Sequence, residues 1–204
     1  MPDYHVPLIP NQVYHIFNRA IGNEKLFKAD RNYFFFLQKY KQHIFPVADT
    51  FAYCLLPNHF HFLIRIKPEE QIAAHYLISK KKEPQLELLS GFIMERFGNL
   101  FNSYAKAFNK EYSRKGNLFM DTMKRVEVEN DGQFGSEVFY VHKNPVHHQY
   151  CEKIEDWKWS SYHSLLSNSN TLLLRQELIE WFGSRKQFID FHHQPIFPKG
   201  QIEE

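Results

Sequence analysis

The chain has 204 residues, of which 43% are hydrophobic and 24% charged, and its formal net charge is +2. These values are typical of a folded globular domain and argue against disorder, collagen and coiled coils. The sequence also lacks an apolar run of the ~20 residues of a membrane helix, a secretory signal pattern, and the cysteines of a disulfide scaffold. We therefore expect a cytoplasmic protein with no membrane partner, in which Cys54 and Cys151 are bystanders.

The first half of the chain predicts a strand, a helix and a β-hairpin. Alternation and β-forming residues mark the strands, and Asp30 is expected to cap the helix, which Pro46 ends. Pro57–Asn58 forms the expected hairpin turn. In chain order these elements are a strand at 13–19, a helix at 31–43, and strands at 50–56 and 59–66.

The second half predicts helices around one further strand. Pro145 disfavours helical geometry at the residue before it, so one helix is expected to end at Asn144. The predictions are a polar loop at 67–82 with a short helix near 71–79, a long amphipathic helix from 86 to about 112, an edge strand within 118–128, a helix from 130 or 131 to 144, and two helical pieces within 172–192 divided at 183–184.

The order of these elements is β-α-β-β-α-β, followed by helices. An antiparallel sheet with two helices on one face satisfies that order, so the predicted class is an α+β, ferredoxin-like fold with additional C-terminal helices. Such a fold leaves one face of the sheet, or a cleft beside it, available for function.

Two histidines on the second hairpin strand are the first candidate site. His59 and His61 stand at i and i+2, so both imidazoles point to one side of the sheet while Phe60 and Phe62 point to the other. Two neutral imidazoles can hold a divalent metal. The plain alternative is a chance pair among 12 histidines, exposed or hydrogen-bonded on a strand. We interpret the pairs 147–148 and 192–193 as surface residues without a role.

A tyrosine helix is the second candidate. Tyr140 and Asn144 are four residues apart and so share one helix face. A phenol is a capable nucleophile for phosphoryl transfer, and an amide oxygen is a suitable ligand for Mg²⁺ or Mn²⁺. The alternative is that Tyr140 simply packs, with Tyr104, Tyr112 and Tyr150 as rival nucleophiles.

Several motifs together resemble a known family. Residues 56–61 resemble the His-hydrophobic-His (HUH) signature of single-tyrosine transposases, and residues 140–146 resemble the tyrosine helix of the REP-associated branch, related to the insertion-sequence 200/605 group. Residues 14–19, 116–119 and 157–162 agree further. One departure is Ala20, where relatives often have glycine. The resemblance spans roughly residues 13–164.

The resemblance implies a transposase-like domain at 1–165, and the remainder, 166–204, is expected to form a helical extension that grips DNA or packs on the domain. It implies His59 and His61 as metal ligands, Tyr140 as the nucleophile, Asn144 as the residue completing the metal site, and Mg²⁺ or Mn²⁺ as the metal. The implied activity is cleavage and transfer of single-stranded DNA beside hairpin-forming repeats, through a 5′-phosphotyrosine. Family members act either as dimers with the tyrosine helix in trans or as monomers with it in cis, so a homodimer stays open.

Basic side chains on the expected active-site side are candidate contacts to DNA phosphates. The four ranked highest are Arg114, Lys115, Lys124 and Arg125, ahead of Arg19, Lys106 and Lys110. Three other functions stay open: a nucleic-acid-binding module without catalysis, a metal phosphodiesterase that uses water, and a domesticated transposase that cuts DNA without moving an element.

Overall fold

The computed structural model describes residues 4–120 and 123–194 and contains one four-stranded sheet. The strands are β1 (Val13–Arg19), β2 (Ala48–Leu56), β3 (His59–Ile66) and β4 (Lys124–Glu127). The helices are α1 (Asp30–His43), α2 (Glu69–Lys80), α3 (Leu89–Glu111), α4 (Asp131–His147), α5 (Tyr162–Leu166), α6 (Arg175–Trp181) and α7 (Arg185–His192), with short 3-10 turns at Leu86–Leu88 and Ile154–Asp156.

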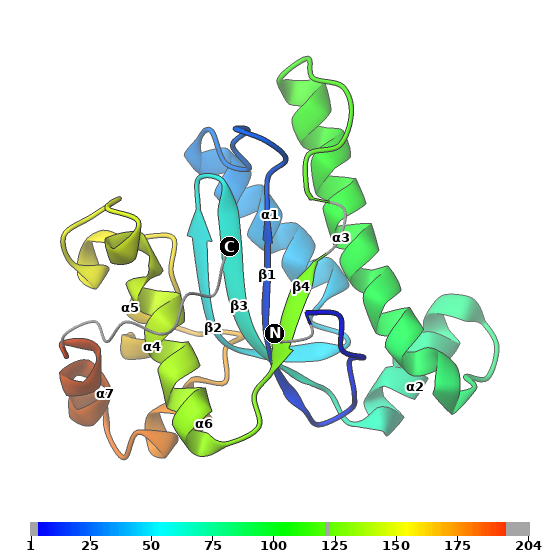
Figure 1. Cartoon of the computed structure of the whole chain (residues 1–204). Helices are drawn as coiled ribbons and strands as arrows, with labels where there is room; N and C mark the ends of the chain where they lie inside the picture. Colours follow the sequence, from blue (N-terminus) through cyan, green and yellow to red (C-terminus); the bar gives the residue numbers. More distant parts are fainter. Residues whose placement is uncertain (1–3, 121–122, 195–204) are drawn as a thin grey trace.

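The sheet has the strand order β2-β3-β1-β4, and every neighbouring pair is antiparallel. The edge strands are the second and fourth in the chain, and the first and third lie between them (Figure 1). This is the order of a ferredoxin-like fold, so the predicted fold class is confirmed.

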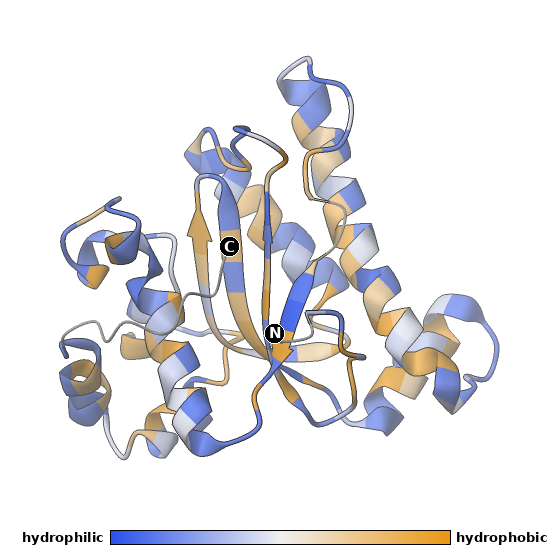
Figure 2. Ribbon diagram, viewed as in Figure 1, coloured by the Kyte–Doolittle hydropathy of each residue, from blue (hydrophilic) through white to orange (hydrophobic). Residues whose placement is uncertain are grey.

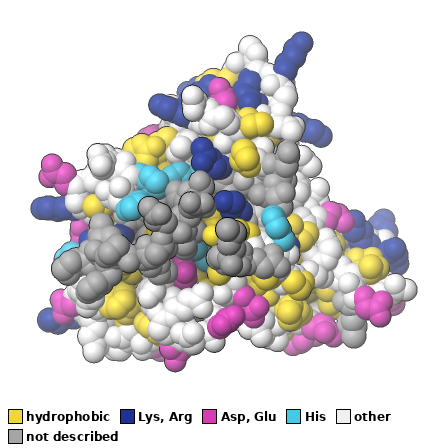
Figure 3. All heavy atoms as spheres, in the orientation of Figure 1, with side chains coloured by type: hydrophobic (Ala, Val, Ile, Leu, Met, Phe, Trp, Pro, Cys, Tyr) yellow, Lys and Arg dark blue, Asp and Glu magenta, His cyan; other side chains and the backbone are white. Residues whose placement is uncertain are grey.

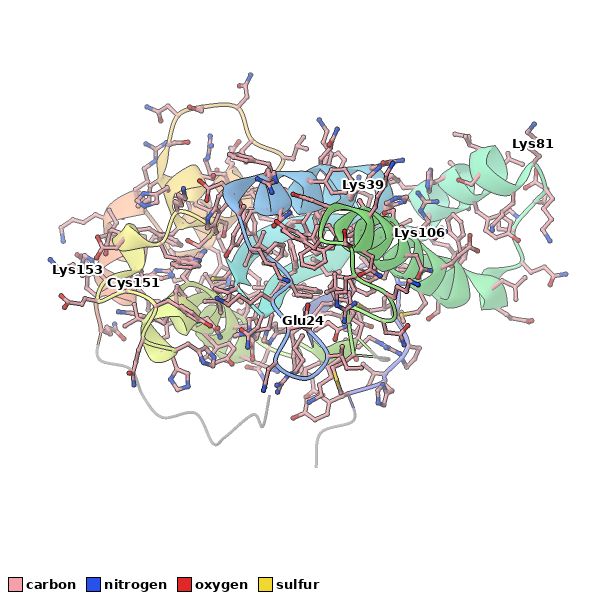
Figure 4. The ribbon with its side chains drawn as sticks, turned by 90° about the horizontal axis from the view of Figure 1, so that it is seen from above. Glu24, Lys39, Lys81, Lys106, Cys151 and Lys153 are labelled. Carbon is pink, nitrogen blue, oxygen red and sulfur yellow. The ribbon has the colours of Figure 1, made fainter. Side chains whose placement is uncertain are left out.

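Helices cover both faces of the sheet. On one face α1 and α3 pack on Phe60 and Phe62, whereas on the other face α4 packs on Cys54 and Leu63 with α5, α6 and α7 outside it. The view from above separates these layers, with Lys39 on α1 and Lys106 on α3 marking the first side (Figure 4). Figure 2 shows β2 hydrophobic along much of its length, whereas β3 becomes hydrophilic toward the hairpin turn and β4 is largely hydrophilic.

Three details of the sequence interpretation are wrong. Asp30 is the first residue of α1 and not its cap; Asn32 reaches back instead, and its Oδ1 accepts hydrogen bonds from the backbone N–H groups of Lys28 and Ala29 at 3.0 Å each. The segment 67–82 is mostly helix and not mostly loop: the short helix expected near 71–79 is present and extends over 69–80 as α2, because Ile72 and Tyr76 find apolar partners in the core.

The third correction concerns the end of the tyrosine helix. α4 continues past Asn144 to His147 with Pro145 inside it. The helix tolerates the proline because it lies in the last turn, where the lost N–H costs one bond and the carbonyls of Asn144 and Pro145 still accept from His148 and Tyr150. A proline therefore disfavours helical geometry at the residue before it without excluding it.

The predicted extension shares a core with the rest of the chain as far as the structure describes it. Leu178 of α6 and Phe188 of α7 are fully buried in the same cluster as Cys54 and Val138. Of the two roles expected for residues after 165, packing on the domain is therefore observed for 166–194; residues 195–204 lie outside the described part.

Both cysteines are free, Cys54 buried and Cys151 half-buried. Among the described residues, no helix has the length and apolar character needed to cross a bilayer.

Candidate active site

The histidine pair of β3 lies beneath α4. His59 is 7% exposed and His61 1% exposed. Phe60 and Phe62 point to the opposite, helix-covered face as predicted. Of the two possibilities expected for the free side of the sheet, an open face is not present, because α4 packs across β2 and β3 on that side (Figure 1).

Asn144 on α4 meets His59 directly. Asn144 Oδ1 lies 3.0 Å from His59 Nε2, and Asn58 Oδ1 lies 2.9 Å from His59 Nδ1. If Nδ1 donates to Asn58, Nε2 carries a lone pair and faces another acceptor. Two arrangements resolve this contact: rotation of the Asn144 amide so that its NH₂ donates, or a cation bound by both atoms.

Tyr140 lies one turn before Asn144 and faces the second histidine. Its half-buried ring packs edge-on against His61 and His15, with centroid separations of 5.4 and 5.7 Å. A single helix face therefore brings the predicted nucleophile and the predicted amide ligand over the histidine pair, all within one chain.

Two further residues of the site were not predicted. His15 of β1 places Nε2 2.9 Å from His61 Nδ1 and Nδ1 2.9 Å from a carboxylate oxygen of Glu137 on α4. All three side chains are buried. The sequence carries a signal for Glu137, because it stands at i−3 from Tyr140 and i−7 from Asn144, on the same face of α4.

A cavity of about 790 Å³ opens beside these residues. That volume falls in the range of ligand sites in proteins. His148, interpreted from the sequence as a surface residue without a role, is half-buried and is one of its lining residues. The lining residues are His5, Phe17, Asn18, Arg19, Gly22, Asn58, His59, His61, Met120, Lys124 and His148.

The loop after β1, where Ala20 replaces the glycine of relatives, has an ordinary backbone. Ala20 has no positive φ, and its N–H donates to the carbonyl of Asn58 at 2.7 Å. The left-handed conformation falls on Gly22 instead, with φ of 57°. The departure from the family pattern therefore leaves this wall of the cavity intact.

The rival tyrosines differ in their access to the site. Tyr104 is buried in the opposite core, where burial raises its pKa and its hydroxyl donates to the carbonyl of Leu26. Tyr112 donates to Asn32 on that same side. Tyr150 is 42% exposed, and its hydroxyl lies 3.5 Å from Asn58 Oδ1. Tyr150 is thus the rival that reaches the cavity rim.

The four basic residues predicted to bind DNA occupy different environments. Lys115 is exposed, and Lys124 lines the cavity with Nζ 5.1 Å from the ring centre of Tyr4. Arg114 binds Glu24 at 3.1 Å and carbonyls of its own loop. Arg125 is buried and donates to the carbonyls of residues 5, 6 and 123. Its role is therefore structural, which removes it from the candidate DNA contacts.

His192, expected at the surface, is fully buried against α4. Its Nε2 lies 2.9 Å from His142 Nδ1, and His142 Nε2 lies 2.7 Å from Ser161 Oγ. Burial lowers the pKa of His192 to about 4 and that of His142 well below its usual value. This network lies on the side of α4 away from Tyr140 and holds α7 in place.

The donor set of the site limits the metal it would take. No group of three or more His, Cys, Asp and Glu side chains arranged for a metal occurs within 4–120 and 123–194. A metal at this site would therefore be held by two imidazoles and the Asn144 amide. Adjacent ligands of one ion, each about 2.1 Å from it, lie roughly 3 Å apart. The 3.0 Å between His59 and Asn144 fits such a pair.

No protein-family model matches the chain. A Haemophilus influenzae protein named "Putative REP-associated tyrosine transposase" is 25% identical over 117 residues, which cover 56% of this chain and 59% of that protein. A solved structure, described as a REP-associated tyrosine transposase bound to a REP hairpin, superposes with a TM-score of 0.58 over 82% of this chain and 87% of the other, at 14% identity.

The resemblance to REP-associated tyrosine transposases is confirmed. Both similar proteins carry that description, one matched by sequence and one by structure. At 14% identity the structural match establishes the common fold. The sequence match spans about three-fifths of the H. influenzae protein, and the REP hairpin belongs to the solved structure.

Proposed function

We propose that this chain is a single-tyrosine transposase that cuts and rejoins single-stranded DNA beside a hairpin through a bond between Tyr140 and a 5′-phosphate. The observation that carries the proposal is the position of α4. It puts Tyr140 against His61 and Asn144 against His59, and both histidines line the cavity. The REP-associated description of both similar proteins supports the same activity.

His59, His61 and Asn144 would hold the divalent metal, Mg²⁺ or Mn²⁺. When bound, such an ion polarises a non-bridging phosphate oxygen and offsets the charge that develops on it. The burial of both imidazoles supports this role, because a dry site strengthens that electrostatic effect.

In the proposed reaction the Tyr140 oxygen attacks phosphorus in line. The new bond joins the tyrosine oxygen to the 5′-phosphate, the bond to the 3′-oxygen breaks, and the phenolic proton is lost as the leaving oxygen gains one. A second 3′-hydroxyl reverses the step and joins a new strand. The phosphotyrosine keeps the energy of the phosphodiester, so no nucleotide triphosphate is consumed.

The protein contributes chiefly by positioning. Packing between two imidazole rings orients the Tyr140 ring. Arg19 and Lys124 line the cavity and would bind phosphates next to the scissile bond. Figure 3 shows histidine and Lys/Arg side chains close together near the middle of one face, with acidic side chains mainly around its edges. This distribution suits a polyanion crossing the middle of the face.

The alternative functions receive less support. A base-stacking platform uses aromatic rings on an open sheet face, whereas α4 covers β2 and β3 on the free side of this sheet. A water-using phosphodiesterase has no need for a tyrosine packed on His15 and His61. Domesticated and mobile transposases would share the same site.

The test is covalent capture of DNA. Wild-type protein, Tyr140→Phe and Tyr150→Phe are incubated with Mn²⁺ and labelled hairpin oligonucleotides taken from repeats flanking the gene, then separated on a denaturing gel. We expect an adduct with wild type and with Tyr150→Phe and none with Tyr140→Phe. Cleavage that persists in Tyr140→Phe without an adduct would establish the phosphodiesterase, and an adduct lost only in Tyr150→Phe would move the nucleophile.

A further inference from the structure

A second hollow, of about 450 Å³, lies between α3 and the segment that follows it, and we call it the α3 groove. Met120 lines this groove and also the cavity of the candidate site, so the two adjoin at one exposed side chain. The residues that line the groove are Gly98, Phe101, Asn102, Ala105, Lys106, Asn109, Gly116, Asn117, Leu118, Phe119 and Met120.

The wall of the groove opposite α3 is held by hydrogen bonds at both of its ends. Asn109 Nδ2 and Arg114 Nη1 donate to the carbonyl of Gly116 at 2.8 and 3.2 Å. At the other end, the N–H of Met120 donates to the carbonyl of Arg19 at 2.9 Å. The wall is therefore fixed between α3 and the end of β1, and the groove keeps one position relative to the cavity.

Gly98 stands in the interior of α3, where a glycine weakens a helix relative to alanine. Packing within the protein does not require it, because a Cβ on Gly98 would meet no neighbouring part of the described structure within 4 Å. A glycine also allows a ligand to approach the backbone closely. Gly98 therefore leaves open space along the groove that a larger side chain would fill.

The side chains of the groove suit a single strand of nucleic acid. Lys106 and Asn102 are exposed, and the Phe101 ring is half-buried. An ammonium group binds a phosphate, an aromatic ring stacks on a base, and an amide both donates and accepts hydrogen bonds at base edges. Among the described residues that line the groove or the cavity, none is acidic, so a polyanion meets no like charge along either wall.

We infer that the α3 groove binds unpaired nucleotides of the DNA strand that enters the cavity, with Lys106 on a phosphate and Phe101 against a base. Gly98 leaves the room that this strand occupies. The identity of the strand rests on the proposed function. The inference adds a second zone of contact, which lies outside the proposed tyrosine and metal ligands and sets how tightly the flanking nucleotides are held.

Gly91 provides a matched control for Gly98. The two glycines are seven residues apart on one face of α3, and a Cβ on either meets no neighbouring part of the described structure within 4 Å. Only Gly98 of the two lines the groove. Gly98→Gln should therefore fill the groove, whereas Gly91→Gln should not. Both variants should melt at or above the wild-type temperature, because glutamine favours a helix more than glycine does.

Binding is measured by fluorescence anisotropy in EDTA, so that the DNA is not cut. The probe is a labelled hairpin oligonucleotide from the repeats flanking the gene, with unpaired nucleotides on both sides. Gly98→Gln should bind it about 10-fold more weakly than wild type, as expected for the loss of one stacked base. Gly91→Gln should bind it as wild type does. Equal affinities of Gly98→Gln and wild type would overturn the inference.

The same hairpin without unpaired nucleotides distinguishes a single strand from a duplex. Gly98→Gln and wild type should bind this blunt hairpin equally, because it has nothing to place in the groove. An equal loss of affinity for both oligonucleotides would show that the groove contacts duplex DNA, and the assignment to unpaired nucleotides would be wrong.

The salt dependence of binding tests Lys106. Lys106→Ala should reduce the salt slope for the extended hairpin by about 0.7, the value for one phosphate contact of a single strand. Lys110→Ala removes the same charge one turn further along α3, from an exposed position outside the groove, and should leave the slope unchanged. Equal changes in the two variants would contradict a phosphate contact at Lys106.

The adduct assay separates a failure of this inference from a failure of the proposed function. If wild type forms the Tyr140 adduct but binding does not depend on Gly98 and Lys106, the groove assignment is wrong and the proposed function stands. If binding depends on both residues but no adduct forms, the groove assignment stands and the proposed chemistry is wrong.

Discussion

Lys124 and Arg125 are neighbours in the sequence, but the pleat of β4 sends them to opposite faces of the sheet. Lys124 stands opposite Phe17 and reaches the cavity, whereas Arg125 stands opposite Ile16 and is enclosed by backbone carbonyls. One of two adjacent charges is thus available to DNA, and the other stabilises the fold.

Matched alanine variants separate these roles. Arg125→Ala should lower the free energy of unfolding by about 2 kcal/mol, because it leaves buried carbonyls without their donor. Lys124→Ala should change stability by less than ~0.5 kcal/mol but reduce the salt slope of DNA binding by about one. Urea unfolding and titration of hairpin DNA at several salt concentrations measure both. Equal stability loss in the two variants would contradict this division.

The sequence was sufficient for part of the site and not for the rest. Spacing alone predicted that His59 and His61 share one side of a strand and that Tyr140 and Asn144 share one side of a helix, because the strand and helix periods are fixed. It did not identify His15 and Glu137, whose partnership depends on α4 folding back over β1 and β3. The same packing buries the histidine pair. The opposite orientations of Lys124 and Arg125 could have been predicted from the sequence, since successive strand residues face opposite sides of the sheet.

At the scale of elements, α4 is the part that joins the site to the C-terminal helices. Its Tyr140 side faces the histidines, while Gly135 lies under α6. A Cβ on Gly135 would be 2.8 Å from the Trp181 ring, closer than real Cβ contacts. The glycine thus permits the close approach of α6.

Two glycines of α4 test this docking against each other. Gly135→Ala should destabilise the protein by about 1–3 kcal/mol, because the added methyl overpacks the contact with Trp181. Gly132→Ala meets only Asn130 Oδ1, at 3.4 Å. It should be neutral or stabilise by up to about 1 kcal/mol through lower chain entropy in the unfolded state. Chemical denaturation of both variants measures these changes. An unchanged stability in Gly135→Ala would show that Trp181 of α6 does not pack closely on Gly135.

The docking of α7 should depend on pH. Folding lowers the pKa of His192 from 6.5 to about 4, chiefly by burial, and lowers that of His142 as well. The unfolded chain therefore binds more protons below pH 6.5, so stability is full above that pH and falls as pH drops toward 4. From pH 7.5 to pH 5, His192 alone should cost about 2 kcal/mol.

Urea unfolding at the two pH values measures this loss. His192→Gln should reduce the difference in stability between the two pH values. His147→Gln, which replaces an exposed histidine at the end of α4, should leave that difference unchanged. If His192→Gln shows the same loss of stability as wild type, other titrating groups cause the pH dependence.

Predicting elements from sequence succeeded where a pattern was long or bounded by clear signals. The strands and α3 follow alternation or helical periodicity, and the break between α6 and α7 falls at Gly183, whose φ is 87°. α2 was expected only as a short helix near 71–79 within a loop, because its apolar face is short, and Ile72 and Tyr76 become buried only through the rest of the core. The end of α4 was misplaced because tertiary packing outweighed the bias before Pro145.

At the scale of the whole molecule, one chain supplies every residue of the proposed centre. β3 gives the histidines and α4 of the same chain gives Tyr140 and Asn144. The arrangement is therefore in cis in this structure, which bears on the choice between the cis and trans arrangements of the family.

Mixing two inactive variants tests this arrangement. Tyr140→Phe and His59→Ala should each fail to form the DNA adduct, and their mixture should fail as well, because neither chain has a complete centre. Adduct formation on the denaturing gel is the readout. Recovery of the adduct in the mixture would show exchange of the tyrosine helix between chains.

Peptide mass spectrometry of the trapped adduct shows most directly whether DNA becomes attached to Tyr140. Trypsin separates Tyr140 from the rival nucleophile Tyr150. Tyr140 is the sole tyrosine of the peptide Val126–Lys143, and Tyr150 is the sole tyrosine of the peptide Asn144–Lys153. We expect a nucleotide-bearing phosphotyrosine on Val126–Lys143. Attachment to Asn144–Lys153 or to any other peptide would contradict it.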